Sequence, residues 1–104
     1  MIDLNNIHQN NWAHTRVSIL GAGLSGIAAA NLGRYVGAEI FISDKNNSRE
    51  IAEKLHEFKH ETGGHSKKIL NTDLLILSPG IPDNIPIIQK CRGENIPIVS
   101  EIEF

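Results

Sequence analysis

The chain has 104 residues, of which 40% are hydrophobic and 21% charged, and its net charge at pH 7 is −2. This length suits a single domain with one hydrophobic core, and the composition excludes a disordered or fibrous chain. Because the charge is slightly negative and no run of Lys and Arg occurs, the sequence gives no basic field for nucleic acid or a membrane surface. An anionic ligand would have to be held by local geometry.

The first residues carry no recognisable targeting signal. Residues 1–15 form a polar, Asn-rich leader that we expect to be loosely ordered, with only Trp12 docking on the domain that occupies residues 16–104. The leader lacks the positive charge and apolar run of a signal peptide, and no stretch of the sequence is long enough to cross a bilayer. The single cysteine, Cys91, cannot form an internal disulfide, so a cytoplasmic protein is the simplest interpretation.

After the leader, strand and helix patterns alternate. The apolar run within 16–20 stops at a glycine and predicts a buried strand. Residues 25–36 include three consecutive alanines and predict a helix that lies close to a sheet, with Gly37 as its C-terminal stop. Residues 39–43 then predict a second buried strand, with Asp44 at its carboxyl end.

A second helix is expected from the N-cap Ser48 to about His60, before a pair of glycines breaks the chain. A short strand near 60–62 would complete a sheet of five strands. Residues 73–77 are nearly all aliphatic and predict a strand that runs into a tight turn at 78–80.

The last predicted helix begins at Pro86 and stops at Asn95, which suits the left-handed position, and a short strand follows at 97–100. Its buried face is expected to consist of Ile87, Ile88 and Cys91. Strands that alternate with helices imply a parallel sheet with right-handed crossovers. The fold class is therefore α/β, a Rossmann-like doubly wound parallel sheet of about five strands in a single domain.

The segment 21–26 reads Gly-Ala-Gly-Leu-Ser-Gly and matches G-x-G-x-x-G between a predicted strand and a predicted helix. Gly21, Gly23 and Gly26 would let the backbone turn tightly and approach a phosphate. The N–H groups of Leu24 and Ser25, at the start of the helix, would point at the anion. No P-loop sequence occurs anywhere in the chain, so we do not expect this chain alone to hydrolyse ATP.

Asp44 follows the glycine loop by about the spacing that separates the pyrophosphate contact from the ribose contact in dinucleotide folds. Together the two features favour a nucleotide. Gly80 would lie near the glycine loop if the order of strands reverses there. The alternatives are that the glycines only permit close packing, that Asp44 caps a loop and that Gly80 belongs to an ordinary Pro-Gly turn.

The segment 56–60 satisfies H-E-x-x-H, the signature of zinc proteases. We reject a metal site because Ile51, Leu55 and Phe58 would form the buried face of the predicted helix, with His56 and His60 on the opposite side. No third ligand is apparent from the sequence.

Five segments together resemble the Mur ligase family, and within it the members that add D-glutamate: 21–26, 43–44, 61–65, 77–82 and 96–103. The similarity spans about residues 16–104. The Ser-Pro-Gly-Ile-Pro run and the closing Glu-Ile-Glu are far more specific than the glycine loop. Family members are several times longer, so the chain resembles an excised amino-terminal domain.

In that family the first domain holds the UDP end of the substrate, UDP-N-acetylmuramoyl-L-alanine. The resemblance implies that the diphosphate lies on the amides of Leu24 and Ser25, and uracil near Asp44, Lys45 and Gly80. It also implies that the parent enzyme, in peptidoglycan synthesis, uses ATP and magnesium to form an acyl phosphate that D-glutamate attacks. The groups for that chemistry belong to absent domains, so we expect no catalytic residue, metal ligand or bound cofactor here.

Two other classes of protein remain open from the residues alone. The glycine loop and Asp44 would equally suit an adenosine ribose, as in an NAD(P)- or FAD-binding domain of an oxidoreductase. The fold could also serve a regulatory or interaction module whose crevice binds no nucleotide.

Overall fold

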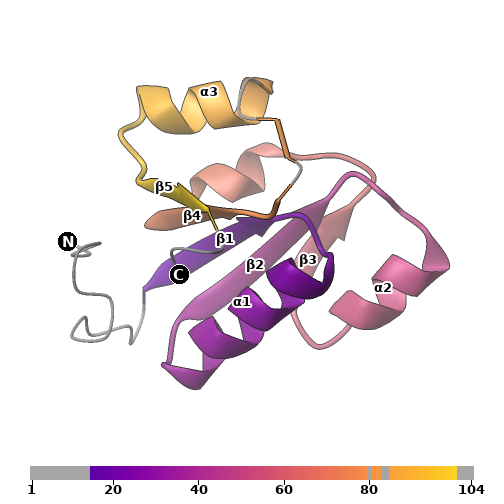
Figure 1. Ribbon diagram of the computed structural model, residues 1–104. Helices are drawn as coiled ribbons and strands as arrows, with labels where there is room; N and C mark the ends of the chain where they lie inside the picture. The colour runs from indigo at the N-terminus through magenta and orange to yellow at the C-terminus, as the bar shows by residue number, and fades with distance from the viewer. Residues whose placement is uncertain (1–14, 80, 83–84, 101–104) are drawn as a thin grey trace.

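The computed structural model describes residues 15–79, 81–82 and 85–100. It contains five parallel strands in the order β3-β2-β1-β4-β5, so the direction of strand addition reverses between β1 and β4 (Figure 1). This confirms the α/β doubly wound sheet. The elements are β1 (Arg16–Leu20), α1 (Leu24–Tyr35), β2 (Glu39–Asp44), α2 (Arg49–Leu55), β3 (Lys59–Thr62), the 3-10 helix η2 (Lys67–Leu70), β4 (Leu74–Leu77), α3 (Pro86–Gly93) and β5 (Ile98–Ser100).

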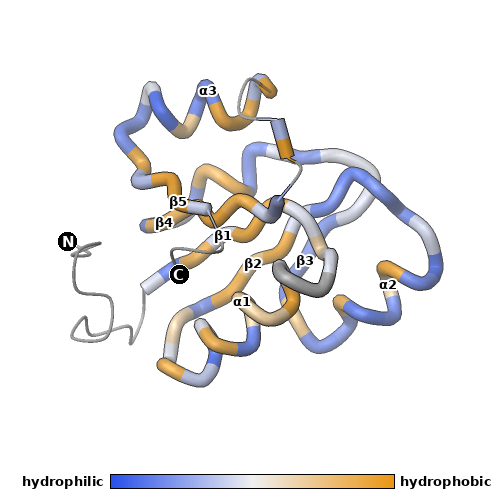
Figure 2. Tube along the Cα trace, viewed as in Figure 1, coloured by the Kyte–Doolittle hydropathy of each residue, from blue (hydrophilic) through white to orange (hydrophobic). Residues whose placement is uncertain are grey.

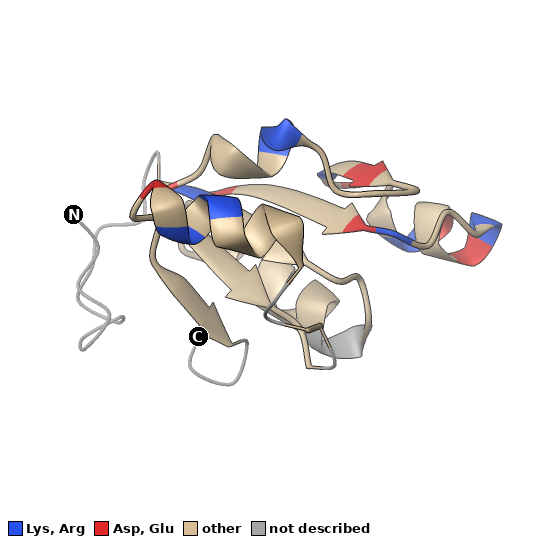
Figure 3. Cartoon of the chain, turned by 90° about the horizontal axis from the view of Figure 1, so that it is seen from above, with Lys and Arg blue, Asp and Glu red and all other residues tan. Residues whose placement is uncertain are grey.

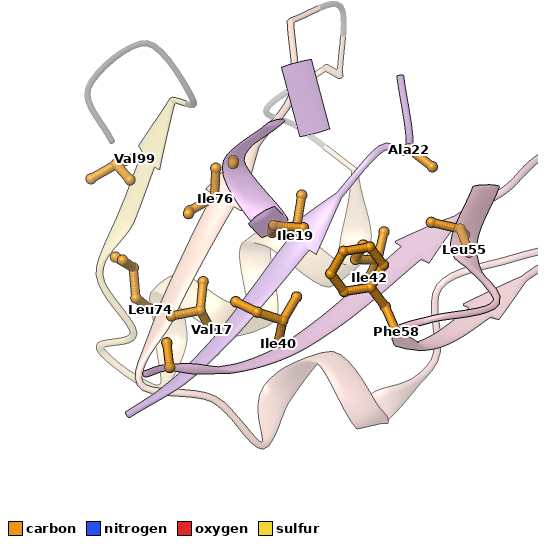
Figure 4. Packing of buried hydrophobic residues seen from close by; sticks show 13 residues of the cluster. Val17, Ile19, Ala22, Ile40, Ile42, Leu55, Phe58, Leu74, Ile76 and Val99 are labelled. Atoms are coloured by element: carbon orange, nitrogen blue, oxygen red, sulfur yellow. The ribbon is translucent and has the colours of Figure 1, made fainter. Parts of the chain in front are cut away.

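Helices cover both faces of the sheet, with α1 and α2 on one face and η2 and α3 on the other (Figure 1). Successive side chains of a strand point to opposite faces, so both faces of this sheet must be apolar. Figure 2 shows this as hydrophobic residues concentrated on the central strands. On the α1 and α2 face, the side chains of Ile42, Leu55 and Phe58 gather in the larger cluster (Figure 4).

The second cluster lies between the sheet and α3. Leu20 and Leu75 come from the sheet and Ile69 from η2, and the helix contributes Ile87, Ile88 and Cys91. The predicted buried face of α3 is thereby confirmed. Burial raises the pKa of the Cys91 thiol, with a smaller contribution from Glu94, so this cysteine is a buried hydrophobic group and not an activated nucleophile.

The ends of α1 and α3 follow the predicted signals. Gly37, just after α1, has φ 95°, and Pro86 occupies the first turn of α3. Asn95, after α3, has φ 59°, the left-handed conformation expected of a residue that stops a helix.

The predicted extent of α2 was wrong. The helix begins after Ser48, as expected, but ends at Leu55, and the chain turns so that Phe58 N–H donates to the Leu55 carbonyl at 2.9 Å. Residues 59–62 then pair with β2 as strand β3. The open edge of β2 offers a ladder of backbone hydrogen bonds, and this tertiary interaction outweighs the local helical pattern.

This correction also changes the account of the H-E-x-x-H segment. His56 is the C-cap of α2 and His60 lies on β3, so the two histidines do not share a helix. Within the described part of the chain, no group of three His, Cys, Asp or Glu side chains could hold a metal ion.

No sequence pattern predicted η2, and three of the predictions fall outside the described residues. These are the order of the leader, the docking of Trp12 and the position of Gly80. Among the helices that the structure describes, none is long and apolar enough to cross a membrane.

Candidate functional site

The glycine loop between β1 and α1 is held by both neighbouring strands. Gly21 N–H donates to the Ser43 carbonyl at 2.8 Å, and Ala22 N–H donates to Asp44 Oδ2 at 2.7 Å. From the other side, the buried Ser78 hydroxyl at the end of β4 donates to the Gly21 carbonyl at 3.0 Å. The loop is therefore fixed where the strand order reverses, as in nucleotide-binding sheets.

The three glycines of the motif have different reasons to be glycine. A Cβ atom on Gly26 would lie 2.1 Å from the Gly21 carbonyl oxygen. Gly21 has φ 99°, and a Cβ there would lie 2.8 Å from Ser78 Cβ. A Cβ on Gly23 would meet no atom of the described residues within 4 Å. The fold therefore explains Gly21 and Gly26, as the close-packing alternative proposed, but it does not explain Gly23.

Gly23 is also the N-cap of α1, and it brings no side chain to cap the helix. At the start of α2, by contrast, the Ser48 hydroxyl accepts a hydrogen bond from Ile51 N–H. The first backbone N–H groups of an α-helix have no acceptor within the helix and carry partial positive charge. The start of α1 thus offers the amide donors of Leu24 and Ser25 beside a space that no described residue fills.

Asp44 connects the glycine loop to the end of β2. Its Oδ2 accepts the bond from Ala22 N–H, and its Oδ1 accepts a bond from Asn46 N–H at 2.8 Å. The structure therefore assigns Asp44 the loop-holding role of the alternative interpretation. A contact between Asp44 and a ligand stays a prediction.

A cleft of about 380 Å³ opens at the same edge of the sheet. It lies between the residues that follow β2, β3 and β4 and the start of α3. Its lining residues are Lys45, His65, Ile81, Pro82, Ile85, Pro86 and Ile87.

The structure places Lys45 in this cleft, whereas the described residues of the glycine loop do not line it. Ile81, which lines the cleft, also lies close to the glycine loop: its Cδ1 atom is 3.6 Å from the position that a Cβ on Gly21 would take. Lys45 is exposed and follows Asp44 directly, and Figure 3 shows acidic and basic positions mixed along the described ribbon. Any attraction for an anion at this edge is therefore local.

A larger cavity, of about 640 Å³, lies at the opposite edge of the sheet. Its lining includes the first residues of three strands: Arg16, Glu39 and Lys59. Ligands of doubly wound sheets bind outside the carboxyl ends of the strands, at the point where the strand order reverses. The smaller cleft beside the glycine loop is therefore the candidate site.

A polar cluster beside this cleft was not predicted from the sequence. Ser43 Oγ, which is buried, lies 2.8 Å from Glu61 Oε2 and 2.7 Å from His65 Nδ1. All three residues belong to segments that carry the family resemblance, but none had been given a role. Their positions at or just beyond the ends of adjacent strands were the available signal, because these ends share one edge of a parallel sheet.

The fold and the glycine-loop edge define a Rossmann-like α/β domain with a candidate ligand site at its strand ends. Residues 15–100 match the family model of the Mur ligase MurD-like N-terminal domain. The chain therefore belongs to the Mur ligase family, as the resemblance predicted.

Curated relatives agree with this assignment. The chain is 45% identical over 90 residues to the UDP-N-acetylmuramoylalanine–D-glutamate ligase of Elusimicrobium minutum, covering 86% of this chain and 20% of the relative. It is 43% identical over 93 residues to the ligase of the same name from Bacteroides thetaiotaomicron, covering 86% and 21%. The chain thus spans about a fifth of the length of the curated relatives it matches.

Solved structures show a similar fold. The UDP-N-acetylmuramate-alanine ligase MurC of Thermotoga maritima matches with a TM-score of 0.66 and 25% identity, over 86% of this chain and 21% of that one. Shikimate dehydrogenase of Aquifex aeolicus matches with a TM-score of 0.59 and 12% identity, over 89% and 44%. The second likeness concerns the fold alone.

Proposed function

We propose that this chain is the UDP-binding amino-terminal domain of a ligase that adds D-glutamate to UDP-N-acetylmuramoyl-L-alanine in peptidoglycan synthesis. Membership of the MurD-like family and the names of the curated relatives support the reaction. The observation that carries the binding role is Gly23, at the uncapped start of α1, where a Cβ would meet no atom of the described residues within 4 Å. A glycine that packing does not require suits a place where a ligand comes close to the backbone.

In this proposal the diphosphate accepts hydrogen bonds from the N–H groups of Leu24 and Ser25. A helix N-terminus favours an anion by roughly 0.3–1 kcal/mol per charge, and by up to about 2 kcal/mol where it is partly buried. The uracil ring occupies the cleft beside the glycine loop, near Asp44, Lys45 and Gly80. Isoleucine and proline side chains of that cleft supply apolar contacts for a flat ring.

The rest of the reaction belongs to other parts of a full-length ligase. We propose that ATP, magnesium and D-glutamate bind to domains beyond this chain, which spans only about a fifth of its curated relatives. No residue here is assigned a catalytic or metal-binding role, and the chain alone is expected to be inactive. The parent protein would act in the cytoplasm.

The test is a titration of the chain with UDP-N-acetylmuramoyl-L-alanine by calorimetry. The Gly23→Val variant should bind at least about tenfold more weakly, because its side chain would occupy the space beside the diphosphate. Gly93→Val is the matched control, since a Cβ on Gly93 also meets no described atom within 4 Å but lies at the far end of α3. Equal affinity of the wild type and Gly23→Val would refute the proposed geometry.

A further inference from the structure

The polar cluster of Ser43, Glu61 and His65 constrains where its protons lie. Ser43 Oγ lies 2.8 Å from Glu61 Oε2 and 2.7 Å from His65 Nδ1. Glu61 also accepts hydrogen bonds from the backbone N–H of Ser66, at 2.8 Å, and from the Ser66 hydroxyl. Each of these contacts needs one proton, and the available protons can be counted.

Glu61 supplies none of them. Burial raises the pKa of its carboxyl group, but the hydrogen bonds from Ser66 and Ser43, with the nearby charge of His65, together hold that pKa below its ordinary value. At neutral pH Glu61 is therefore a carboxylate, which only accepts hydrogen bonds.

The single hydroxyl proton of Ser43 must then point to the Glu61 carboxylate, since otherwise two unprotonated oxygens would face each other at 2.8 Å. The weaker contact of Ser43 Oγ with the Gly64 carbonyl, at 3.4 Å, would use the same proton. No proton of Ser43 remains for His65, so the 2.7 Å contact requires that Nδ1 of the imidazole be the donor. The cluster thereby selects the Nδ1–H tautomer of His65.

The other ring nitrogen lies on the side of the ring away from Ser43, and His65 lines the cleft with Lys45. Burial lowers the pKa of the imidazole below its ordinary value. The charges of Glu61 and Asp44 oppose this effect, and the charge of Lys45 adds to it. At neutral pH the ring is therefore uncharged, and its Nε2 atom has a lone pair and no proton.

We propose that His65 is a specificity-determining residue of the uridine site: its Nε2 atom accepts a hydrogen bond from an N–H or O–H group of the ligand. This inference rests on the proposed function. The matching donors are the imide N–H of uracil and the 2′-hydroxyl of ribose. A diphosphate has only acceptors at neutral pH, so it does not match Nε2, whereas the ammonium group of Lys45 can serve it.

The tautomer can be tested without a ligand. Long-range ¹H–¹⁵N correlation spectra of the chain at pH 7.5, with His65 assigned through a His65→Gln variant, should show protonated Nδ1 and unprotonated Nε2. Ser43→Ala, which removes the acceptor, should shift the population towards Nε2–H. Nε2–H as the main tautomer of the wild type would overturn the inference, whether or not Ser43→Ala folds.

The binding role is tested with UMP, N3-methyl-UMP and 2′-deoxy-UMP. Wild type should bind the analogue that lacks the donor roughly fivefold or more weakly than it binds UMP. That analogue is N3-methyl-UMP if the partner of Nε2 is the imide, and 2′-deoxy-UMP if the partner is the 2′-hydroxyl. The His65→Phe variant should lose that discrimination. His56→Phe, an exposed position at the end of α2, is the matched control and should keep it.

The outcomes separate the two proposals. Binding of UMP by wild type, with discrimination that survives in His65→Phe, would remove His65 from the site and leave the proposed function standing. Equal affinity of wild type for all three nucleotides would likewise remove His65 from the site and leave the proposed function standing. Absence of UMP binding by wild type would overturn the proposed function, and the inference about His65 with it.

Discussion

Gly23 and Gly26 belong to one motif, but the structure gives different reasons for a glycine at each position. Gly26 has no room for a side chain because of the Gly21 carbonyl, whereas a Cβ on Gly23 would meet no atom of the described residues within 4 Å. Gly26→Ala should therefore lower the free energy of unfolding by several kcal/mol, on the scale of an overpacked core. Gly23→Ala should cost at most about 1 kcal/mol, because alanine is a poorer N-cap than glycine.

Urea denaturation of both variants measures this difference. A Gly26→Ala protein as stable as wild type would show that α1 and the Gly21 carbonyl can move apart without cost. That result would remove the structural explanation of the third glycine.

Asp44 holds the loop through two backbone N–H groups, those of Ala22 and Asn46. Asp44→Ala should cost about 1–3 kcal/mol of stability, since both donors lose their acceptor. It should also speed amide hydrogen exchange at Ala22, and it should weaken ligand binding because the glycine loop would be displaced. The stability of Asp44→Asn, which keeps one carbonyl oxygen as an acceptor, should lie between that of wild type and that of Asp44→Ala. Unchanged exchange at Ala22 in Asp44→Ala would contradict this role.

At the scale of elements, the pairing of β2 with β3 places Glu61 and His65 beside Ser43. The pKa of His65 is lowered in the fold, chiefly by burial, so its contribution to stability is complete above about pH 6.5, the ordinary imidazole value, and is lost as the pH falls. The lowered pKa of Glu61 adds a further loss below its ordinary value of 4.5.

The free energy of unfolding should therefore decrease more between pH 7.5 and pH 5.5 in wild type than in His65→Gln. Urea denaturation at the two pH values measures both decreases. The other histidines are present in both proteins, so their effects cancel in this comparison. Equal pH dependence would show that the imidazole of His65 is not held neutral by the fold.

The elements that the sequence predicted well are those with strong local signals. Apolar runs predicted β1, β2 and β4, and the pair of Pro86 and Asn95 marked the limits of α3. The end of α2 was missed because Phe58 continues the helical spacing of apolar residues, while its burial occurs in the turn after the helix. The stabilisation from pairing β3 with β2 depends on residues far apart in the sequence, so a short stretch of sequence does not reveal it.

The candidate site was predictable only in part for the same reason. The glycine loop has a local motif, and Lys45 follows a strand end. The partners of Ser43 lie 18 and 22 residues away and meet it only through the parallel register. The tautomer of His65 depends on which atoms of the cluster donate and which accept hydrogen bonds. These atomic contacts cannot be read from sequence spacing.

For the whole molecule, family membership narrows the functions that the fold alone leaves open. The likeness to a shikimate dehydrogenase, at 12% identity, shows that this sheet also occurs in an oxidoreductase. The MurD-like family match over residues 15–100 places this chain with the Mur ligases, and on it rests our proposal of a UDP-linked ligand instead of a nicotinamide. The slight negative charge of the chain does not oppose this, because the donors at the start of α1 act locally.

The most direct test is an NMR titration of the chain with UDP-N-acetylmuramoyl-L-alanine, run beside UMP and NAD under the same conditions. The account predicts chemical-shift changes at the amides of Leu24, Ser25, Asp44 and Gly80 with the two uridine ligands and none with NAD. A response to NAD alone would contradict it and would assign the domain to the dinucleotide-binding oxidoreductases.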